Sequence, residues 1–372
     1  MLKLLSIVRD FGACSHIRMR QIVKEIKRKE LARVFEVDAT HPQWEAEDIT
    51  EEGVKKANLI WIGRSVSKNI IGLTKIAQDN GIKVLFDLDD FVLDVSPWSA
   101  HYDVLGTEEF NYNGRPMWKD KVNIDLKQNR KRRSEFIEYL KVVGALSVTT
   151  PRLMECYKPY ANKIYVFPNT VDMKKWDYGM SVKKNPNKVK IFWQGGISHY
   201  EDFWEIADVI PEITKKYPQV HWVNMGAAWE FFWNKIPKER HEYIDWAFSE
   251  AYPYVMKLVG ADIGIAPLRD TKFNRCKSSI KFYEYSALGM PTVASNVPPY
   301  CDDMVDGKNG FLASSPKEWM EKLSILIEDS IVRNRLAGAA YKYVESERSV
   351  EVVTPLIVQA MEAYVSGKGL PN

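Results

Sequence analysis

The sequence predicts an α/β protein built from two doubly wound domains, and two observations lead to that prediction. At 372 residues the chain is longer than one ordinary hydrophobic core supports, so two domains of roughly 150 to 180 residues each are expected. Short apolar runs also alternate with longer helical stretches, in two series separated by a polar segment. Such alternation is typical of βαβ units with parallel strands.

The first series of apolar runs predicts the strands of an N-terminal Rossmann-like domain over residues 1–172. These runs are Leu4–Val8, Val34–Val37, Leu59–Ile62, Val84–Phe86, Leu146–Val148 and Ile164–Phe167. After Pro168 the composition becomes polar and loop-like, and we interpret residues 173–187 as the linker between the domains.

The second series predicts a C-terminal Rossmann-like domain over residues 188–349. Its runs are Val189–Trp193, Val220–Val223, Ile263–Ala266 and Thr292–Ala294. The tail from about Pro316 to Gly367 is mostly helical in pattern, and we expect a helix at about 350–372 to pack back on the first domain. Two such domains facing each other place a cleft between the carboxyl ends of their sheets, where these folds bind ligands.

Composition excludes several classes of protein. Hydrophobic residues make up 45% of the chain and charged residues 27%, with no apolar run near the roughly 18 residues that a membrane span needs. Arg9 interrupts the apolar N-terminal stretch too early for a secretory signal. Four widely separated cysteines without CxxC spacing indicate neither a zinc site nor a disulfide framework. A cytoplasmic setting is therefore expected, with peripheral association at a membrane left open.

Two lysines lie close together at the beginning of one predicted helix. The pattern predicts a helix over residues 279–288, with Lys277 and Lys281 one turn apart at its beginning. A helix N-terminus already carries about half a positive charge, and like charges four residues apart repel, so this placement is unfavourable unless an anion offsets it. A diphosphate would neutralise both ammonium groups and use the free N–H groups near Ser278, with Arg275 adding to the cluster.

Glu284 lies one turn beyond Lys281 on the same predicted face. A carboxylate there would be within reach of a sugar attached to the diphosphate, and it can accept hydrogen bonds from the two vicinal hydroxyls of a ribose. A nucleoside diphosphate satisfies both ends of this face. The structural alternative is that the lysines are solvated and that Glu284 pairs with Lys281 along the helix.

These residues also resemble a family. The segments Ala261–Leu268, Phe273–Glu284 and Ala287–Ser295 look like the donor-binding signature of retaining glycosyltransferases of family 4, the glycosyl transferases group 1, which have the GT-B fold. The resemblance implies that Glu284 binds the nucleotide ribose and that basic residues near it hold the diphosphate.

The full family signature has two glutamates separated by seven residues, and the first of these positions is Cys276 in this chain. A subgroup with an Asn-x-x-Lys-Ser pattern resembles the sequence better. For that subgroup the resemblance implies that Asn274 and Lys277 take the place of the first glutamate. The contact to the transferred sugar stays open.

Two further segments agree with the resemblance. Phe167–Asp172 resembles the Pro-Asn-Gly-Val-Asp element that ends the first domain in this family, and Phe192–Asp202 resembles the glycine loop of the second domain. Two adjacent glycines let the backbone approach a phosphate closely, and neighbouring polar side chains can donate hydrogen bonds to it. The candidates for phosphate contact are Gly195, Gly196, Ser198 and His199.

In the first domain, Gly12–Arg18 follows the first predicted strand and opens a helix, which is the loop that faces the ligand in a Rossmann-like domain. It resembles the family's glycine loop, where donor and acceptor meet. Gly12, His16 and Arg18 are candidates for contact with phosphate or acceptor. A plain helix start capped by Ser15 is the alternative.

Phe86–Asp90 ends another predicted strand, so its carboxylates are expected to point toward the same cleft. We favour acceptor binding for Asp87 and Asp89 over a metal site, because basic residues already supply positive charge for the diphosphate. No metal and no permanently bound cofactor are predicted.

One basic cluster stands out in a chain whose net charge is only +3. Between Lys119 and Arg133 it contains Lys119, Lys121, Lys127, Arg130, Lys131, Arg132 and Arg133 against Asp120 and Asp125. It fits an anionic lipid surface or a DNA backbone as a partner, and equally a solvated helix face.

The predicted function is sugar transfer with retention, from a nucleotide-diphosphate sugar such as a UDP-sugar to a hydroxyl of a glycan, lipid-linked sugar or protein. The residues expected to act in catalysis are Arg275, Lys277, Glu284 and Asp87. Alternatives are transfer to modified DNA bases, a catalytically silent sugar-nucleotide-binding protein, which the cysteine at position 276 motivates, and a nucleotide-sugar epimerase on the same fold.

Overall fold

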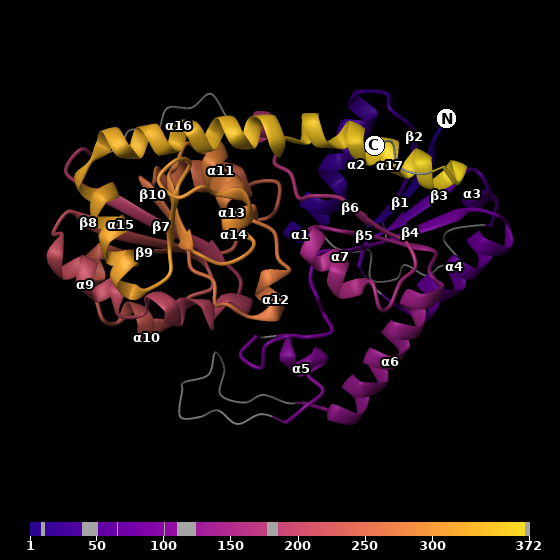
Figure 1. Cartoon of the computed structure of the whole chain (residues 1–372), viewed down its shortest axis with the longest axis horizontal. Coiled ribbons are helices and arrows are strands. Elements are labelled where there is room, and N and C mark those ends of the chain that lie inside the picture. Colours follow the sequence, from indigo (N-terminus) through magenta and orange to yellow (C-terminus); the bar gives the residue numbers. More distant parts are fainter. Residues whose placement is uncertain are drawn as a thin grey trace. The chain divides into compact units, whose positions relative to one another are not determined.

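The computed structural model describes residues 1–8, 12–38, 51–64, 66–99, 101–109, 124–176 and 185–368. The chain forms two compact units, each with its own parallel sheet (Figure 1). The predicted class, α/β with two doubly wound sheets, is confirmed.

The two units are not continuous in the chain. Unit 1 comprises Met1–Phe91, Lys131–Asp172 and Glu347–Asn372, and unit 2 comprises Val92–Arg130 and Met173–Ser346. The segment Val92–Arg130, which sequence reasoning placed in the first domain, therefore clusters with the second sheet.

Unit 1 contains a six-stranded sheet in the order β2-β1-β3-β4-β5-β6, with every neighbouring pair parallel. Its strands are β1 (Lys3–Val8), β2 (Arg33–Asp38), β3 (Leu59–Ile62), β4 (Lys83–Leu88), β5 (Ala145–Val148) and β6 (Ile164–Val166). The order turns back at β1, where successive strands are added on opposite sides. This is the doubly wound pattern whose ligand site lies at the carboxyl ends of the strands.

Helices cover the unit 1 sheet. They are α1 (Ala13–Ser15), α2 (Gln21–Arg28), α3 (Glu51–Lys55), α4 (Lys68–Asp79), α7 (Pro151–Tyr157) and α17 (Val350–Ser366), with a π-helical stretch His16–Arg20 between α1 and α2 and with α6 (Leu126–Val142) crossing the division between the units. The last helix, α17, packs against α2 (Figure 1). Its apolar residues Val353, Ile357 and Met361 are buried in the core with Leu4 and Ile22.

Unit 2 contains the second six-stranded sheet, in the order β12-β11-β10-β7-β8-β9 and again parallel throughout. Its strands are β7 (Val189–Gly195), β8 (Val220–Gly226), β9 (His241–Ile244), β10 (Ile263–Ala266), β11 (Thr292–Ser295) and β12 (Phe311–Ala313). The core beneath it is rich in aromatic side chains, including Trp193, Trp222, Phe203, Phe232 and Trp319.

Most helices described in unit 2 are short, and the two at its end, α15 and α16, are long. They are α5 (Tyr102–Leu105), α8 (Met173–Trp176), α9 (Val209–Lys216), α10 (Glu230–Trp233), α11 (Tyr252–Val259), α12 (Lys272–Arg275), α13 (Ile280–Ala287), α14 (Tyr300–Asp303), α15 (Pro316–Glu328) and α16 (Ser330–Glu347). None of the helices in the described part of the chain has the length and apolar character that crossing a bilayer requires.

The helix that carries Lys281 and Glu284 differs from the prediction at its beginning. α13 begins at Ile280, and Lys277 lies before it, in the turn that follows α12. The expected alignment of both lysines along one helical face is therefore wrong. The predicted end is confirmed: Gly289 follows with φ of 69°, a left-handed conformation that glycine adopts without steric cost.

Candidate active site

In unit 2 the predicted donor-side residues gather where the parallel strands end. β7 ends at Gly195 and leads into a short 3-10 turn, Ile197–His199. Glycine is required at the end of β7, because a Cβ on Gly195 would approach the Trp193 ring to 2.7 Å. Gly196, next in the loop, lies beside the ring of Trp246, which is 61% exposed.

His199 connects two charged side chains. Its Nδ1 lies 2.6 Å from Asp202 Oδ2 and its Nε2 lies 2.8 Å from Lys281 Nζ. Burial lowers the pKa of His199 well below its ordinary value, and the positive charges of Lys281 and Lys277 lower it further. The imidazole is therefore neutral, and it joins the turn after β7 to the first turn of α13.

Asp202 holds this cluster to the loop that follows β10. Besides His199, its carboxylate accepts hydrogen bonds from the Arg269 backbone N–H at 2.9 Å and from Asn274 Nδ2 at 2.8 Å, both on Oδ1. Only 1% of Asp202 is exposed. Burial raises the pKa of this carboxyl group to about 6, although the donors and the two nearby lysines oppose the shift.

Glu284 is buried on the next turn of α13, with 3% of the residue exposed. Its Oε2 accepts hydrogen bonds from Gln194 Nε2 at 2.9 Å and from Tyr252 OH at 3.1 Å. Burial raises the pKa of Glu284 to about 7, and Lys281 and the Tyr252 hydroxyl restrain the rise. The alternative in which Lys281 is a solvated surface residue fails, because Lys281 is only 6% exposed.

The remaining predicted donor-side residues lie around this cluster with different partners. Arg275 is exposed and paired with Asp270 through two hydrogen bonds, one of 2.7 Å. Lys277 is half-buried, with its ammonium 4.7 Å from the centre of the Phe273 ring, and it acts electrostatically on His199. Cys276, at the position of the family's first glutamate, is a buried thiol with 2% exposure.

In unit 1 the structure ties two predicted acceptor-side residues to each other. Arg18 donates to both carboxylate oxygens of Asp87, at 2.9 Å from Nε and 2.7 Å from Nη2. Arg18 also donates to the Phe167 carbonyl and to Asn169 Oδ1, and Ser147 donates to Asp87. Both partners are about 4% exposed as side chains. This buried ion pair connects the helical stretch after β1 with β4, and the further hydrogen bonds of Arg18 connect both to the segment after β6.

Asp89 lies closer to the surface at the end of the same strand as Asp87. It pairs with Arg64 at 3.0 Å, while Asp90 lies 3.8 Å from the same guanidinium group. Burial opposes ionisation of Asp89, yet Arg64, the Cys14 thiol and Arg18 together lower its pKa. Within the described residues, no three His, Cys, Asp or Glu side chains gather as metal ligands.

Gly12 lies between β1 and the first helix, as the sequence predicts. Gly12 is exposed and its carbonyl accepts a hydrogen bond from the His16 N–H at 3.1 Å, which starts the helical stretch. No side-chain cap from Ser15 supports this start. His16 is half-buried beside the glycine loop.

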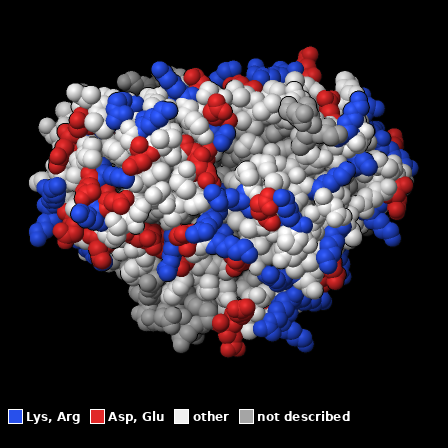
Figure 2. All heavy atoms as spheres, viewed as in Figure 1, with Lys and Arg blue, Asp and Glu red and all other residues white. Residues whose placement is uncertain are grey.

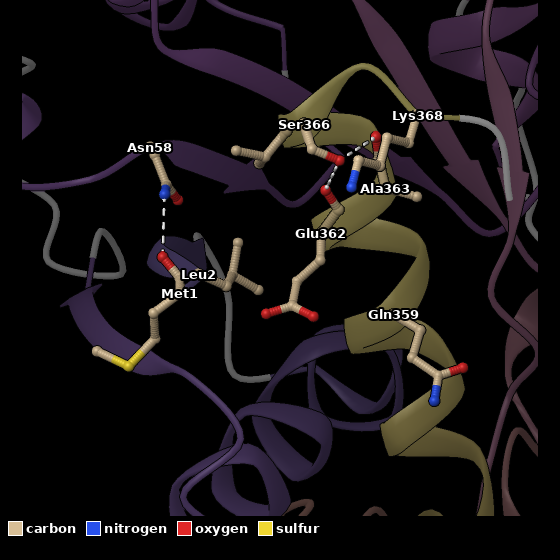
Figure 3. A pocket seen from close by; sticks show the side chains of 9 residues that line it. Met1, Leu2, Asn58, Gln359, Glu362, Ala363, Ser366 and Lys368 are labelled. Carbon is tan, nitrogen blue, oxygen red and sulfur yellow. Dashed lines mark hydrogen bonds between the residues drawn. The ribbon is translucent and has the colours of Figure 1, made fainter. Parts of the chain in front are cut away.

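A hollow of about 500 Å³ in unit 1 lies at the other edge of the sheet (Figure 3). Met1 and Leu2 precede β1, and Asn58 precedes β3, so this hollow adjoins the amino ends of the strands. Glu362 and Ser366 of α17 form its other wall. It is therefore separate from the residues at the carboxyl ends that sequence reasoning selected.

The basic cluster lies mainly on α6. Lys119 and Lys121 are outside the described residues, whereas Lys127 and the basic residues from Arg130 to Arg132 are exposed. Basic side chains gather at the lower right of Figure 2, where Figure 1 places α6. Arg130 donates to the Thr107 carbonyl at 3.1 Å, and Lys131 lies 3.9 Å from Glu135.

Sequence reasoning missed several residues of the donor-side cluster. Asp202, Gln194, Tyr252 and Arg269 were not selected, although Asp202 lies inside the segment that resembles the family's second glycine loop. The spacing from His199 to Asp202, three residues apart in a helical turn, was the available signal.

One comparison with known proteins covers the part of the chain that forms the second sheet. The sequence profile of the family described as "Glycosyl transferases group 1" matches residues 188–329. That range contains β7 and α13, and with them the whole donor-side cluster. No curated protein sequence matches the chain.

Solved structures are similar over nearly the whole chain. HepE from Anabaena, in complex with UDP and glucose, is 13% identical with a TM-score of 0.64, covering 98% of this chain and 100% of its own. Sucrose-phosphate synthase from Thermosynechococcus elongatus is 11% identical with a TM-score of 0.63, covering 99% and 100%.

A protein from Listeria monocytogenes, provisionally named UDP-N-acetylglucosamine 2-epimerase, is also similar, at 11% identity and a TM-score of 0.52 over 100% of this chain and 98% of its own. At such identities these similarities establish the fold alone. The predicted GT-B fold, with two Rossmann-like units, is confirmed.

Proposed function

We propose that the protein is a retaining glycosyltransferase that transfers a sugar from a UDP-sugar to an acceptor hydroxyl. The observation that carries the proposal is the buried pair of Lys281 and Glu284 on α13, one turn apart, at the ligand edge of the sheet. The group 1 family profile covers this part of the chain, and HepE binds UDP-glucose on the same fold.

Two oppositely charged residues of α13, Lys281 and Glu284, hold the two ends of the nucleoside diphosphate. The Lys281 ammonium, with Lys277 nearby and the backbone of Gly195 and Gly196, neutralises the diphosphate. Glu284 receives the ribose hydroxyls. The hydrogen bonds from Gln194 and Tyr252 both go to Oε2, so Oε1 is the oxygen proposed to accept from the ribose.

Catalysis in this proposal is electrostatic. Negative charge develops on the departing UDP while the acceptor hydroxyl attacks from the same face of the sugar, and each fixed donor aimed at that charge is worth about 3 to 4 kcal/mol. Lys281 and Lys277 supply such donors, with Ser198, Asn274 and Ser278 at the edge of the site. Arg275 joins them only after leaving Asp270.

The acceptor side belongs to unit 1. Gly12, His16 and Asp89 are the proposed contacts, because they are less buried than the paired Arg18 and Asp87 side chains. These two act by holding the loop after β6 in place. The acceptor class, whether glycan, lipid-linked sugar or protein, follows the family resemblance.

The exposed basic residues of α6 are the proposed contact with an anionic surface, which would make the protein peripheral at a membrane. A DNA acceptor is the competing reading of the same residues. Replacing Arg130, Lys131 and Arg132 by glutamine separates the two. Loss of binding to vesicles with anionic lipid supports the membrane, and loss of transfer to DNA supports the nucleic acid.

A panel of nucleotide sugars in a thermal-shift assay tests the donor. A ligand at 100 times its dissociation constant stabilises a fold by about 2.7 kcal/mol, so UDP-glucose or a related donor should raise the midpoint clearly. The Glu284→Ala variant should lose the shift. Glu321→Ala is the control, because Glu321 is an exposed carboxylate on α15. No shift with any UDP-sugar would contradict the proposal.

An epimerase is the second candidate, since the protein from Listeria monocytogenes has a similar fold. The two activities separate by their products. Incubation with the donor that binds, followed by NMR of the sugar, distinguishes an epimerised nucleotide sugar from a glycoside with retained anomeric configuration. Formation of the epimer without any acceptor would exclude the glycosyltransferase. Binding of the donor with no product at all would indicate a catalytically silent sugar-nucleotide-binding protein.

A further inference from the structure

One buried carboxylate in unit 2 has no part in the proposed chemistry. Asp202 accepts hydrogen bonds from three donors on three segments: the His199 ring, the Arg269 backbone and the Asn274 side chain. These segments are the turn after β7, the loop after β10 and the short helix α12. All three carry residues that the donor site uses or adjoins.

The His199 ring transmits this contact to Lys281. An ammonium group has three donors and no acceptor, so at 2.8 Å the Nε2 of His199 must accept from Lys281. The neutral ring then carries its proton on Nδ1 and donates it to Asp202 Oδ2. Donors and acceptors alternate along Lys281, His199 and Asp202, which fixes a single tautomer of the ring.

We infer that Asp202 is a positioning residue of the donor site: it selects the His199 tautomer that holds the Lys281 ammonium in place. The inference rests on the proposed function only in that Lys281 meets the donor. Without the carboxylate, the ring is free to carry its proton on Nε2. Two donors would then face each other between His199 and Lys281, and the ammonium would move away.

The loop that Asp202 holds is fixed a second time by the neighbouring carboxylate. Arg269 donates its backbone N–H to Asp202 and places its guanidinium 3.1 Å from Glu201 Oε1. Ser96 donates to the other oxygen of Glu201. Loss of Asp202 therefore affects the His199 and Lys281 contacts without releasing the loop altogether, which makes an isosteric variant a fair test.

The inference predicts the tautomer of the His199 ring in the Asp202→Asn variant. Both the Arg269 N–H and Asn274 Nδ2 point at Oδ1, so the amide oxygen of the new side chain takes that place. Its NH₂ group then faces His199 Nδ1, which must accept. The ring of His199 is expected to switch from the Nδ1–H to the Nε2–H tautomer. Asp202→Glu keeps the carboxylate and should keep the original tautomer.

The tautomer is measured directly by nitrogen-15 NMR of the histidine rings in the full chain without ligand. Six histidines are present, and the spectrum of His199→Gln identifies the signals of His199 by their loss. Wild-type protein should show Nδ1–H. A ring in the Nε2–H form, or a protonated ring, at pH 7 would overturn the inference even if no variant folded.

Binding of UDP, measured by calorimetry, links the tautomer to the site. Asp202→Asn should weaken UDP binding by roughly tenfold or more, by analogy with the partners that orient metal ligands, whose loss costs about 10- to 100-fold. Asp202→Glu should recover part of the affinity. The matched control is Asp303→Asn in the same unit, because Asp303 accepts from Tyr283 and Tyr343 at 2.6 Å each.

Equal losses of UDP affinity in Asp202→Asn and Asp303→Asn would overturn the inference, since they would mark a general loss of stability. An unchanged tautomer in Asp202→Asn would overturn it as well. If the wild-type protein binds no UDP, the proposed function fails, while the NMR result still decides whether Asp202 sets the ring.

Discussion

Burial places the Glu284 carboxyl group where its protonation changes near neutral pH. The pKa of Glu284 is raised from 4.5 to about 7 in the folded protein. Between these values the folded state holds a proton that the unfolded state has released. The contribution of Glu284 to the free energy of unfolding is therefore fully present below about pH 4.5 and is lost as the pH rises through about 7.

The variant Glu284→Gln removes this titration and isolates its energy. A shift of this size corresponds to about 3 kcal/mol. As the pH rises from 4.5 to 8, the free energy of unfolding of the variant should increase by roughly this amount relative to that of the wild-type protein. The reason is that the wild-type carboxyl group must ionise in the interior over this range. Denaturant titrations at several pH values measure the difference. A gap independent of pH would contradict the raised pKa.

The Arg18 and Asp87 pair leads to a prediction about stability in unit 1. Removing one partner of a buried ion pair leaves the other charge uncompensated, which typically costs about 3 to 5 kcal/mol of stability. Asp87→Asn should therefore be strongly destabilising in denaturant unfolding. Asp89→Asn is the control, since its partner Arg64 is 39% exposed and is left in contact with water. Comparable losses in both variants would contradict this distinction.

At the scale of the element, α13 ends through a glycine that cannot be replaced freely. Gly289 has φ of 69° with open space around its Cβ position, so only the backbone conformation opposes a side chain there. Gly289→Ala should cost about 1 kcal/mol. Gly338 in α16 also has open space and no positive φ, so Gly338→Ala should stabilise by roughly 0.5 to 1 kcal/mol. Thermal unfolding compares the two, and equal signs would contradict the argument.

Most strands could be predicted from apolar runs, and the two that were missed show why. β3 and β10 were predicted to the residue, because Leu59–Ile62 and Ile263–Ala266 are buried on both faces and read as continuous apolar runs. β9, His241–Ile244, is an edge strand with no fully buried residue, and β12 has three residues. The sequence of β9 contains no apolar run, and the run in β12 is only three residues long, so neither was selected.

The candidate site could be predicted only where its residues lie in one local pattern. Lys281 and Glu284 share a helical face and were selected from that spacing. Asp202 and Gln194 reach the same place from the other side of β10. Their role depends on burial and on distances across the sheet, which no single segment of sequence contains. Lys277 was misplaced because the break between α12 and α13 leaves no proline or glycine as a marker.

At the scale of the whole molecule, the described residues form a core in each unit, and these two cores should respond separately to substitution. Met361 of α17 is fully buried in the unit 1 core, and Leu326 of α15 is fully buried in the unit 2 core. Replacing either by alanine should cost roughly 2 to 5 kcal/mol. Hydrogen exchange in the full chain should rise in β1 and α2 for Met361→Ala, and in β7 and β8 for Leu326→Ala.

Increased exchange in both sheets from either variant would show that the units unfold together. The expected result is selective, because α17 contacts α2 while α15 contacts α9 and β11. Substitution of exposed Leu356 on α17 is a suitable control. Its replacement by alanine should leave exchange in both units unchanged.

The return of α17 to unit 1 has a consequence for the order of events during synthesis on the ribosome. Unit 2 ends at Ser346 and has all its strands before that point, so its core can close as soon as α16 has emerged. Unit 1 starts first but must wait for Val350 to Tyr364 before its core is complete. Domains that fold during translation usually close in the order in which they are made. Here the half that is begun first is finished last, and part of its apolar face stays uncovered until α17 has been made.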